Sequence, residues 1–271
     1  MKPLILIRGG GDLASGVALR LHRVGFPVAI LELEHPLSVR RAVSFSEAVY
    51  EGAHKVEGVT ARLVSADQFQ VALEAGEIPV LIDPNADVLR NQFVISPNST
   101  FLVDARLRKT EPEPLPVQLP LHIGLGPGFT AGENCHAVIE TRRSHTLGRA
   151  LWSGPTQPDS GQPEGDPHRV LRAPVEGFVE PLKAIGDMCR EGEEIARMNE
   201  SHAISAPFDG VLRGLIHPSI NASKGMKIGD IDPRNDSSAC FLVSDKALAV
   251  GGGVLEAVLM KMREMEWSAA P

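Results

Sequence analysis

The chain has 271 residues, enough to bury one large or two modest hydrophobic cores. Its 27 Lys and Arg and 34 Asp and Glu give a formal net charge of -7, and aromatic residues make up 4% of it. This acidic balance, without a basic run and with few aromatic side chains, argues against nucleic-acid binding. The apolar opening is too short to span a bilayer and lacks the features of a signal peptide, so we expect a cytoplasmic protein without membrane association.

The cysteines and histidines give no sign of a metal site. Cys135, Cys189 and Cys240 lie far apart and form no C-x-x-C pair, so neither a disulfide framework nor a thiolate zinc site is expected. The nine histidines include no H-x-x-x-H or H-E-x-x-H grouping. We therefore predict that the protein binds no metal.

The opening of the chain carries the clearest functional pattern. An apolar run at 4–7, three glycines and the helical spacing of 17–23 predict a strand, a tight turn and a helix. Gly9, Gly11 and Ala14 match the pattern G-x-G-x-x-G/A, in which small residues let the backbone approach a diphosphate at a helix N-terminus. The sequence favours a Rossmann-like nucleotide-binding turn, with a purely structural turn as the alternative.

A second predicted strand, 28–31, ends in an acid. Glu32 stands about 20 residues beyond the glycines, where the dinucleotide pattern places an acceptor for a ribose hydroxyl. Residues 34–50 read as a loop that turns into an amphipathic segment. Its paired Arg40 and Arg41 are suited to a bidentate phosphate contact near such a nucleotide, or they are two charges on a solvated helix face.

Acidic residues stand at the ends of several predicted strands. The elements expected next are a strand, a helix and two buried parallel strands: 59–64, 66–75, 78–83 and 101–106. Because ligands sit outside the carboxyl ends of the strands in open α/β sheets, Glu32, Asp83 and Asp104 are expected along one rim. Each acid is equally explained as a helix cap or turn former.

A second glycine-rich loop follows a stiff proline-rich linker at 111–116. The loop contains Gly126 and Gly128 and stands at the end of a further predicted strand. A strand at 135–141 leads into residues 142–149, where cations, hydroxyls and flexible backbone are concentrated. Such a stretch is suited to an anionic ligand.

An internal repeat marks a separate β unit. Residues 152–168 lack periodic apolar positions and read as a mobile loop or domain boundary. Beyond it, 172–179 recurs as 205–212, each with an A-P-x-(E/D)-G turn before a short strand. This duplication resembles the flattened β-barrel of biotinyl and lipoyl domains. The junction 196–202 has no lysine where such a domain carries its modifiable one, so a carrier function is not expected.

The chain closes as it began. Residues 246–259 read once more as a strand, glycines and a helix, which we expect to rejoin the first sheet because such a unit cannot bury its apolar faces alone. The predicted fold is α/β. It comprises a Rossmann-like parallel-sheet domain, an inserted barrel-sandwich-hybrid (biotinyl/lipoyl-like) domain without a carrier lysine, and a return to the first domain, at 1–155, 169–233 and 234–271.

Several motifs together resemble one family. They are RGGGDLASGVA, HPLSVRRAVSFSEAV, GLGPGFTAG, VIETRRSHTLGR and KALAVGGGVLEA, and they cover nearly the whole chain. The sequence resembles the YqeB-type accessory proteins of selenium-dependent molybdenum hydroxylase systems, which are distantly similar to the XdhC-type accessory proteins of xanthine dehydrogenase. The resemblance implies a role in maturing molybdenum cofactor or inserting it into a hydroxylase apoenzyme, and whether a reaction is catalysed stays open, as does assembly into a homo-oligomer.

On this hypothesis the ligand is a molybdopterin-type dinucleotide or another nucleotide. The glycines and Asp12 would contact the diphosphate, and Glu32 would contact the ribose. The loop that follows the predicted strand at 135–141 would contact further phosphates or the pterin. The candidate binding residues are Gly9, Gly10, Gly11, Asp12, Glu32, Arg40, Arg41, Gly126, Gly128, Arg142, Arg143 and His145.

Three alternatives stay open. An NAD(P)-dependent oxidoreductase would share the opening pattern, although the single tyrosine, Tyr50, has no lysine four residues on. A non-catalytic scaffold would use the β unit to dock a hydroxylase subunit. Cys135 beside His136 suggests sulfur transfer if the neighbouring cation favours the thiolate, while buried packing is the simpler explanation of this cysteine.

Overall fold

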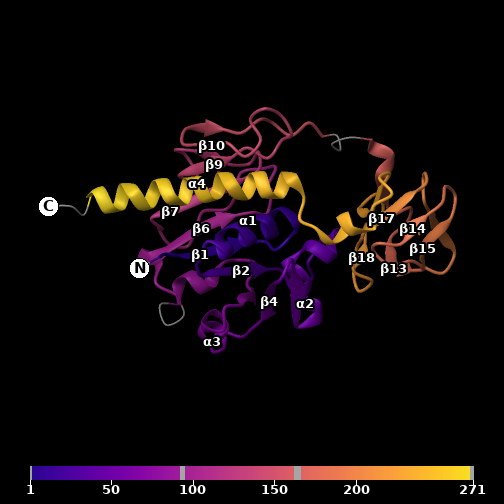
Figure 1. The fold of residues 1–271 in the computed structure, drawn as a ribbon, viewed down its shortest axis with the longest axis horizontal. Coiled ribbons are helices and arrows are strands. Elements are labelled where there is room, and N and C mark those ends of the chain that lie inside the picture. Colours follow the sequence, from indigo (N-terminus) through magenta and orange to yellow (C-terminus); the bar gives the residue numbers. More distant parts are fainter. Residues whose placement is uncertain (1, 92–94, 162–165, 269–271) are drawn as a thin grey trace.

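The computed structural model describes residues 2–91, 95–161 and 166–268, which form a larger α/β unit and a smaller β unit at one end of it (Figure 1). The strands of the larger unit are β1 Leu4–Arg8, β2 Val28–Glu32, β3 Ala53–Val56, β4 Val59–Leu63, β5 Ile78–Ile82, β6 Thr100–Asp104, β7 Leu121–Leu125, β8 Thr130–Ala131, β9 Ala137–Ile139, β10 Ala150–Leu151 and β11 Gly154–Pro155. The helices are α1 Asp12–Arg23, α2 Ala48–Glu51, α3 Phe69–Glu74 and α4 Asp245–Ser268, with the 3-10 turns η1 Arg41–Val43 and η2 Phe45–Glu47 between β2 and α2.

Within the described residues, nine of these strands form one sheet in the order β10-β9-β7-β6-β1-β2-β5-β4-β3. The seven inner strands run parallel, and only the edge strands β3 and β10 are antiparallel to their neighbours. The fold is therefore α/β with a mostly parallel sheet, as predicted. The carboxyl ends of the parallel strands all meet at one edge, where the loops that follow β1, β6, β7 and β9 gather.

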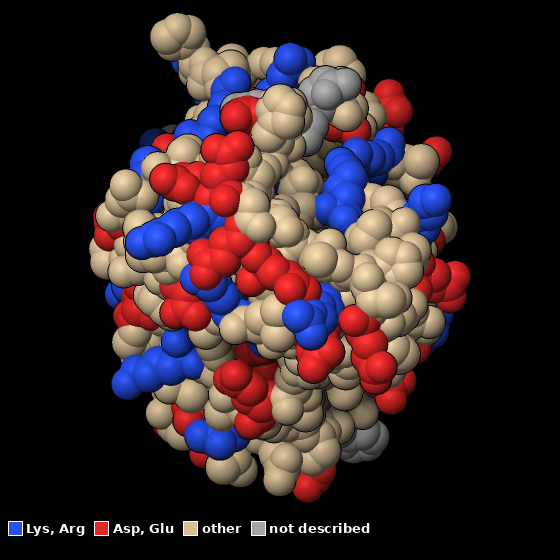
Figure 2. Space-filling model, turned by 90° about the vertical axis from the view of Figure 1, so that its right-hand side faces the viewer, with Lys and Arg blue, Asp and Glu red and all other residues tan. Residues whose placement is uncertain are grey.

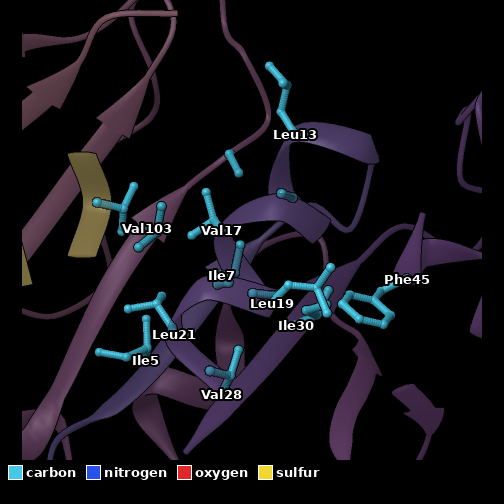
Figure 3. Close-up of a cluster of buried hydrophobic side chains, with 14 of the residues drawn as sticks. Ile5, Ile7, Leu13, Val17, Leu19, Leu21, Val28, Ile30, Phe45 and Val103 are labelled. Atoms are coloured by element: carbon cyan, nitrogen blue, oxygen red, sulfur yellow. The ribbon is translucent and has the colours of Figure 1, made fainter. Parts of the chain in front are cut away.

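The strand β1 lies in the middle of the sheet because its side chains are apolar on both faces. Ile5 and Ile7 pack against α1 and α4, and Leu6 packs on the opposite face with Phe69 of α3. Figure 3 shows Val17 of α1 among the β1 side chains. Each such fully buried side chain contributes about 1.5–3 kcal/mol relative to an exposed one.

The helix α3 is shorter than predicted. The spacing predicts a helix over 66–75, but α3 begins at Phe69. The preceding residues form a turn in which the Ser65 hydroxyl donates to Asp67 at 2.5 Å and the Ser65 N–H donates to the Gln68 side chain at 3.3 Å. Local bonds of this kind compete with the helix for its first turn.

The prediction for the closing segment is wrong in one element, because residues 245–268 form a single helix without a strand. Its glycines serve close packing. A Cβ on Gly251 would lie 2.7 Å from the carbonyl oxygen of Gly16 in α1, and one on Gly253 would lie 2.0 Å from the carbonyl oxygen of Gly148. These glycines let α4 run along α1 at short range (Figure 1).

The smaller unit contains two four-stranded antiparallel sheets among its described residues. Their strands are β12 Val170–Arg172, β13 Gly177–Pro181, β14 Met188–Cys189, β15 Glu194–Met198, β16 His202–Ser205, β17 Gly210–Leu215, β18 Asn221–Ala222 and β19 Lys227–Asp232, in the orders β12-β19-β17-β14 and β16-β15-β13-β18. Buried side chains of both sheets, among them Val179 and Leu212, form one apolar core. The two copies of the repeat lead into β13 and β17.

The boundary between the units is described only in part. The predicted loop at 152–168 contains β11 and a 3-10 turn, Pro167–Arg169, whereas residues 162–165 lie outside the described residues. By length and composition alone, the segment Ser237–Glu266 could cross a membrane, a test that core helices of soluble proteins also pass. Here it includes α4, whose Val250 and Val254 lie in the core of the larger unit.

Candidate functional site

A cavity of about 910 Å³ lies between the two units, which is large enough for a dinucleotide-sized ligand. The larger unit contributes the N-terminus of α1, the loops after β6, β7 and β9, and the first residues of α4. The smaller unit contributes strands β12, β17 and β19. The cavity therefore stands outside the carboxyl ends of the parallel strands, where open α/β sheets bind their ligands.

The lining of this cavity is rich in cations. Among the described lining residues nine are basic and five are acidic, namely Arg40, Lys109, Arg142, Arg143, Arg169, Arg213, Lys227, Arg234 and Lys246 against Asp12, Asp159, Asp230, Asp232 and Asp245. The outer face of the smaller unit differs, because Figure 2 shows basic and acidic residues interspersed over it. The excess of positive charge belongs to the cavity and suits an anionic ligand.

Two carboxylates on β19 fix the arginines around them. Asp230 accepts two hydrogen bonds of 2.8 Å from Arg169, and Asp232 accepts bonds of 2.9 and 2.6 Å from Arg234. The Arg234 guanidinium is the main reason that the pKa of Asp232 falls to about 2. Asp232 thus stays ionised at neutral pH, and both acids hold their arginines in bidentate geometry.

Burial has the opposite effect on the one lysine of β19. Loss of solvent lowers the pKa of Lys227, and the charges of Arg169 and Arg213 lower it further against the attraction of Asp230. Lys227 makes no ion pair within 4 Å with any residue that the structure describes. Its ammonium group is therefore available to an anion in the cavity.

The structure brings five of the predicted binding residues together in this cavity. They come from four separate segments and are Asp12, Arg40, Gly126, Arg142 and Arg143. The other seven do not line it, namely Gly9, Gly10, Gly11, Glu32, Arg41, Gly128 and His145. Of these, His145 lies exposed in the loop after β9.

Glu32 contacts the glycine turn itself. One carboxylate oxygen accepts the Gly10 N–H at 2.6 Å and the other accepts the Leu33 N–H at 2.7 Å. Burial raises the pKa of Glu32, and these two backbone bonds oppose the rise. Glu32 is only 8% exposed, and its carboxylate stabilises the glycine turn through these two bonds.

The segment after η1 covers the same turn. The Ser46 N–H donates to the Gly10 carbonyl at 2.9 Å, and the Ser15 hydroxyl accepts the Phe45 N–H at 2.8 Å. A Cβ on Gly10 would lie 2.8 Å from the Ser46 nitrogen, whereas one on Gly11 would meet only the Ser38 hydroxyl at 3.5 Å. Gly10 is required by the protein's own packing.

The second glycine loop packs on the segment that follows β6. A Cβ on Gly128 would lie 2.2 Å from the carbonyl oxygen of Thr110, and the Gly128 N–H donates to the Arg108 carbonyl at 2.8 Å. Gly126 has a φ of +108°, which favours glycine, and lines the cavity. Both glycines therefore have a structural reason, and Gly126 alone lies where a ligand could touch it.

Arg41 points to the other side of the junction from Arg40. It pairs with Glu47 and donates from Nε to the Leu215 carbonyl at 2.8 Å. With Glu47, Glu51, His54 and Lys183 it lines a second cavity of about 550 Å³. The paired arginines thus face two different cavities.

The three acids expected along one rim stand at the ends of β2, β5 and β6, and each makes contacts within the protein. Asp83 accepts the N–H groups of Asp87 and Val88 at 2.9 Å each, which makes it a cap. Asp104 holds Arg106 through bonds of 2.9 and 2.6 Å. Neither acid lines the 910 Å³ cavity.

Arg8 and Glu113 tie the proline-rich linker to the rim. Arg8, 2% exposed, donates from Nη2 to Glu113 at 3.0 Å and to the Pro84 carbonyl at 2.7 Å. Burial alone would raise the pKa of Glu113, but bonds from its backbone and from Arg106 and the charge of Arg8 hold that pKa at about 2. The linker is clamped in place at neutral pH.

Cys135 does not have the environment of a reactive thiol. Burial raises its pKa to about 11. The neighbouring His136 accepts the His122 N–H on Nδ1 at 3.0 Å, and burial lowers its pKa, so it supplies no cation at neutral pH. The geometry supports the packing explanation of this cysteine.

Sequence reasoning missed the cations that the smaller unit contributes. The sequence does not single out Arg169, Arg213 or Lys227, because polar residues on short strands are ordinarily solvated. A partial signal was present in residues 230–232, where two Asp flank an apolar residue and so share one face of a strand, as carboxylates that hold cations would.

The chain is similar to a longer bacterial protein. No family model matches the sequence. It is 46% identical over 266 residues to the Escherichia coli (strain K12) protein named "Uncharacterized protein YqeB", an alignment that covers 96% of this chain. The chain spans 48% of that relative's length.

Likeness to solved structures is weak. An aspartoacylase family protein from Mesorhizobium loti is 10% identical with a TM-score of 0.25, and a succinylglutamatedesuccinylase/aspartoacylase from Rhodobacter sphaeroides is 13% identical with a TM-score of 0.26, each covering 85% of both chains. Scores this low do not bear on the fold or function. What the comparisons establish is that this chain is similar, along nearly its whole length, to about half of E. coli YqeB.

Proposed function

We propose that this chain is an accessory protein that helps mature molybdenum cofactor or insert it into a selenium-dependent molybdenum hydroxylase. It binds a molybdopterin-type dinucleotide or another nucleotide in the cavity between its two units. The observation that carries the binding role is the excess of cations in a 910 Å³ cavity beside the N-terminus of α1.

The fold supports the same proposal. A Rossmann-like reading fits β1, the glycine turn and α1, and a barrel-sandwich-hybrid reading fits the duplicated strands of the smaller unit. The hairpin between β15 and β16 has Asn199 and Glu200 at its tip, both with positive φ, and no lysine. We take the smaller unit to be one wall of the binding site. The assignment to the molybdenum cofactor pathway rests on the motif resemblance.

The cellular setting follows from the pathway. A cofactor of this kind is delivered to a hydroxylase apoenzyme, which we propose as the protein partner, in the cytoplasm. A scaffold role for the smaller unit would be an addition to ligand binding and not a replacement for it.

A different placement of the ligand follows from the geometry of the turn. In the dinucleotide pattern the acid after the second strand accepts from a ribose hydroxyl, but here Glu32 already accepts the Gly10 N–H. We therefore propose that the diphosphate lies toward Asp12 and Arg40 in the cavity. An NAD(P)-dependent oxidoreductase, which would need the ribose contact, is the less favoured function.

The proposal is tested by calorimetry and thermal unfolding of the purified protein with molybdopterin cytosine dinucleotide, molybdopterin, CTP, CDP, NAD and NADP. A ligand at 100 times its Kd raises the free energy of unfolding by about 2.7 kcal/mol. Selective binding of a pterin dinucleotide supports the proposal. Binding of NAD or NADP alone contradicts it and favours the oxidoreductase.

A matched pair of variants locates the site. Arg142 lines the cavity and Arg149 is exposed seven residues further on outside it. We expect Arg142→Gln to weaken binding about tenfold, since a charge-assisted contact contributes about 1.5–3 kcal/mol, and Arg149→Gln to leave it unchanged. Equal effects of the two variants would place the ligand elsewhere.

A further inference from the structure

One buried arginine in the cavity has no hydrogen-bonded partner. The Arg213 side chain, on β17, is 12% exposed, and none of its nitrogens donates a hydrogen bond to a residue that the structure describes. The nearest carboxylate oxygens, of Asp230 and Asp232, lie 3.6 and 3.7 Å from Nη1. Both acids already hold another arginine at shorter distances. A guanidinium left this way is costly, because buried donors normally have partners.

A second arginine from the other unit lies beside it. Arg40 is 8% exposed, donates from Nη2 to the Leu242 carbonyl at 3.1 Å, and lies 3.4 Å from Asp12. Its Nε has no partner among the described residues. Burial lowers the pKa of Arg213, and the charge of Arg40 is the next largest cause, so the two guanidinia repel each other.

The local charge is unbalanced by two units. The ion pairs of Arg169 with Asp230 and of Arg234 with Asp232 are each neutral. The cations that remain are Arg40, Arg213 and Lys227, and only Asp12 opposes them. An anionic group of charge -2 would neutralise the cluster, and a guanidinium pair presents the planar donors that phosphate oxygens accept.

We propose that Arg40, Arg213 and Lys227 form a subsite for a phosphate or diphosphate moiety that carries two negative charges in total. Two sources have this chemistry, the terminal phosphomonoester of a nucleotide and the diphosphate bridge of a dinucleotide. The subsite lies within the cavity assigned to the ligand and so rests on the proposed function. Because Arg40 and Arg213 belong to different units, the phosphate also joins the two units.

The main test uses Arg213→Met with Arg149→Met as the matched control. The affinity of the purified protein for inorganic phosphate and for pyrophosphate is measured at constant ionic strength, together with the unfolding temperature without ligand. We expect Arg213→Met to weaken the binding of at least one probe tenfold or more while its unfolding temperature is unchanged or higher, since a buried guanidinium without hydrogen bonds has gone. Arg149→Met keeps wild-type affinity.

Unchanged affinity in Arg213→Met would overturn the subsite. A fall in unfolding temperature without a change in affinity would also overturn it, because it assigns Arg213 a structural role. If Arg213→Met does not fold, Lys227→Met replaces it, since Lys227 lines the same cavity from β19. A severalfold loss of phosphate affinity in Lys227→Met supports the subsite, and wild-type affinity overturns it.

Nucleotide probes distinguish the two sources and the two proposals. A loss of CMP binding in Arg213→Met identifies a terminal phosphomonoester, and a loss confined to dinucleoside diphosphates identifies the bridge. If pterin and nucleotide ligands bind wild type and Arg213→Met equally, the subsite fails and the proposed function stands. If none of them binds wild type but Arg213→Met abolishes phosphate binding, the subsite stands and the proposed function fails.

Discussion

The two cavities at the junction differ in the balance of charge that lines them. The larger has nine basic and five acidic residues among those that the structure describes, whereas the smaller has Arg41 and Lys183 against Glu47 and Glu51. In the smaller one, Arg41 pairs with Glu47. Unbalanced charge, and not a hollow alone, is therefore the feature on which the proposed ligand site rests.

The same two short segments build both cavities. Residues 39–41 and 213–215 lie against each other, with Arg40 and Arg213 toward the larger cavity and Arg41 bonded to Leu215 beside the smaller. Between them Gly214 approaches the Val39 backbone. Packing holds the units in place, so that the two arginines are kept close despite their repulsion.

Breaking that packing should give the largest effect. A Cβ on Gly214 would lie 2.6 Å from the Val39 carbonyl oxygen, a backbone atom that cannot turn aside. We expect Gly214→Ala to lower the free energy of unfolding by about 3 kcal/mol, measured by urea titration, because overpacking at a fixed contact strains both segments.

The control for this variant is Gly252→Ala. Gly252 lies within α4, and a Cβ there meets nothing within 4 Å. Since Ala is favoured over Gly inside a helix by about 1 kcal/mol, we expect the control to be slightly more stable than wild type. A Gly214→Ala protein as stable as wild type would show that the junction is not tightly packed.

Removing a charge from the larger cavity should give the next largest effect. The pKa of Asp232 falls from 3.8 to about 2, so the stability that it contributes is complete above pH 3.8 and is lost as pH falls toward 2. We expect Asp232→Asn to lower the free energy of unfolding at pH 7 by about 2 kcal/mol and to match wild type near pH 2.

The same variant raises the cavity's positive charge, so phosphate should bind it more tightly. Asp245→Asn is the matched control for the loss of stability. Asp245 lines the same cavity, but its side chain is 75% exposed, where an ion pair contributes about 0–1 kcal/mol. Weaker phosphate binding to Asp232→Asn than to wild type would contradict the charge argument.

A smaller effect on the free energy of unfolding is expected beside the smaller cavity, whose described basic and acidic residues are equal in number. The rings of Tyr50 and His217 stack across the junction with centroids 3.8 Å apart and an interplanar angle of 1°. Tyr50→Leu should lower the free energy of unfolding by about 1 kcal/mol and leave phosphate affinity unchanged. A large loss of phosphate affinity in Tyr50→Leu would mean that the two cavities are coupled.

The smallest effect is expected at Lys183. It lines the smaller cavity and forms an ion pair of 2.6 Å with the half-exposed Glu193. Lys183→Gln should change the free energy of unfolding by less than about 0.5 kcal/mol and should not change phosphate affinity, because exposed pairs contribute little. If Lys183→Gln lowered the affinity for phosphate as much as Arg213→Met does, the two cavities could not be distinguished by their charge.

The sequence was sufficient to predict strands from continuous apolar runs, but it was not sufficient to predict the structural role of the glycines in α4. The runs at 4–7 and 101–106 are too short for helices and too apolar for loops, and both are strands of the sheet. The glycines at 251–253 look like a turn in sequence, but they meet Gly16 and Gly148, which are distant in the chain. Only the tertiary contact shows that they serve helix packing.

The part of the candidate site that the larger unit contributes could be predicted, and the part that the smaller unit contributes could not. Arg40 and Arg142 stand next to glycine loops and strand ends, where α/β sheets bind ligands, so they could be named. Arg213 lies between apolar residues on a strand of the other unit, and its role depends on how the two units face each other. A sequence pattern contains no information of that kind.

The path of the chain sets an order on biosynthesis. The face of α1 that holds Gly16 is covered by α4, which is made only after the whole smaller unit. While residues 245–268 are still being synthesised, the apolar side of α1 lacks its cover, and contacts between the first and last helices join distant parts of the chain. The larger unit therefore finishes folding last although its synthesis begins first, and a ribosome stalled before α4 would leave its core exposed to proteases.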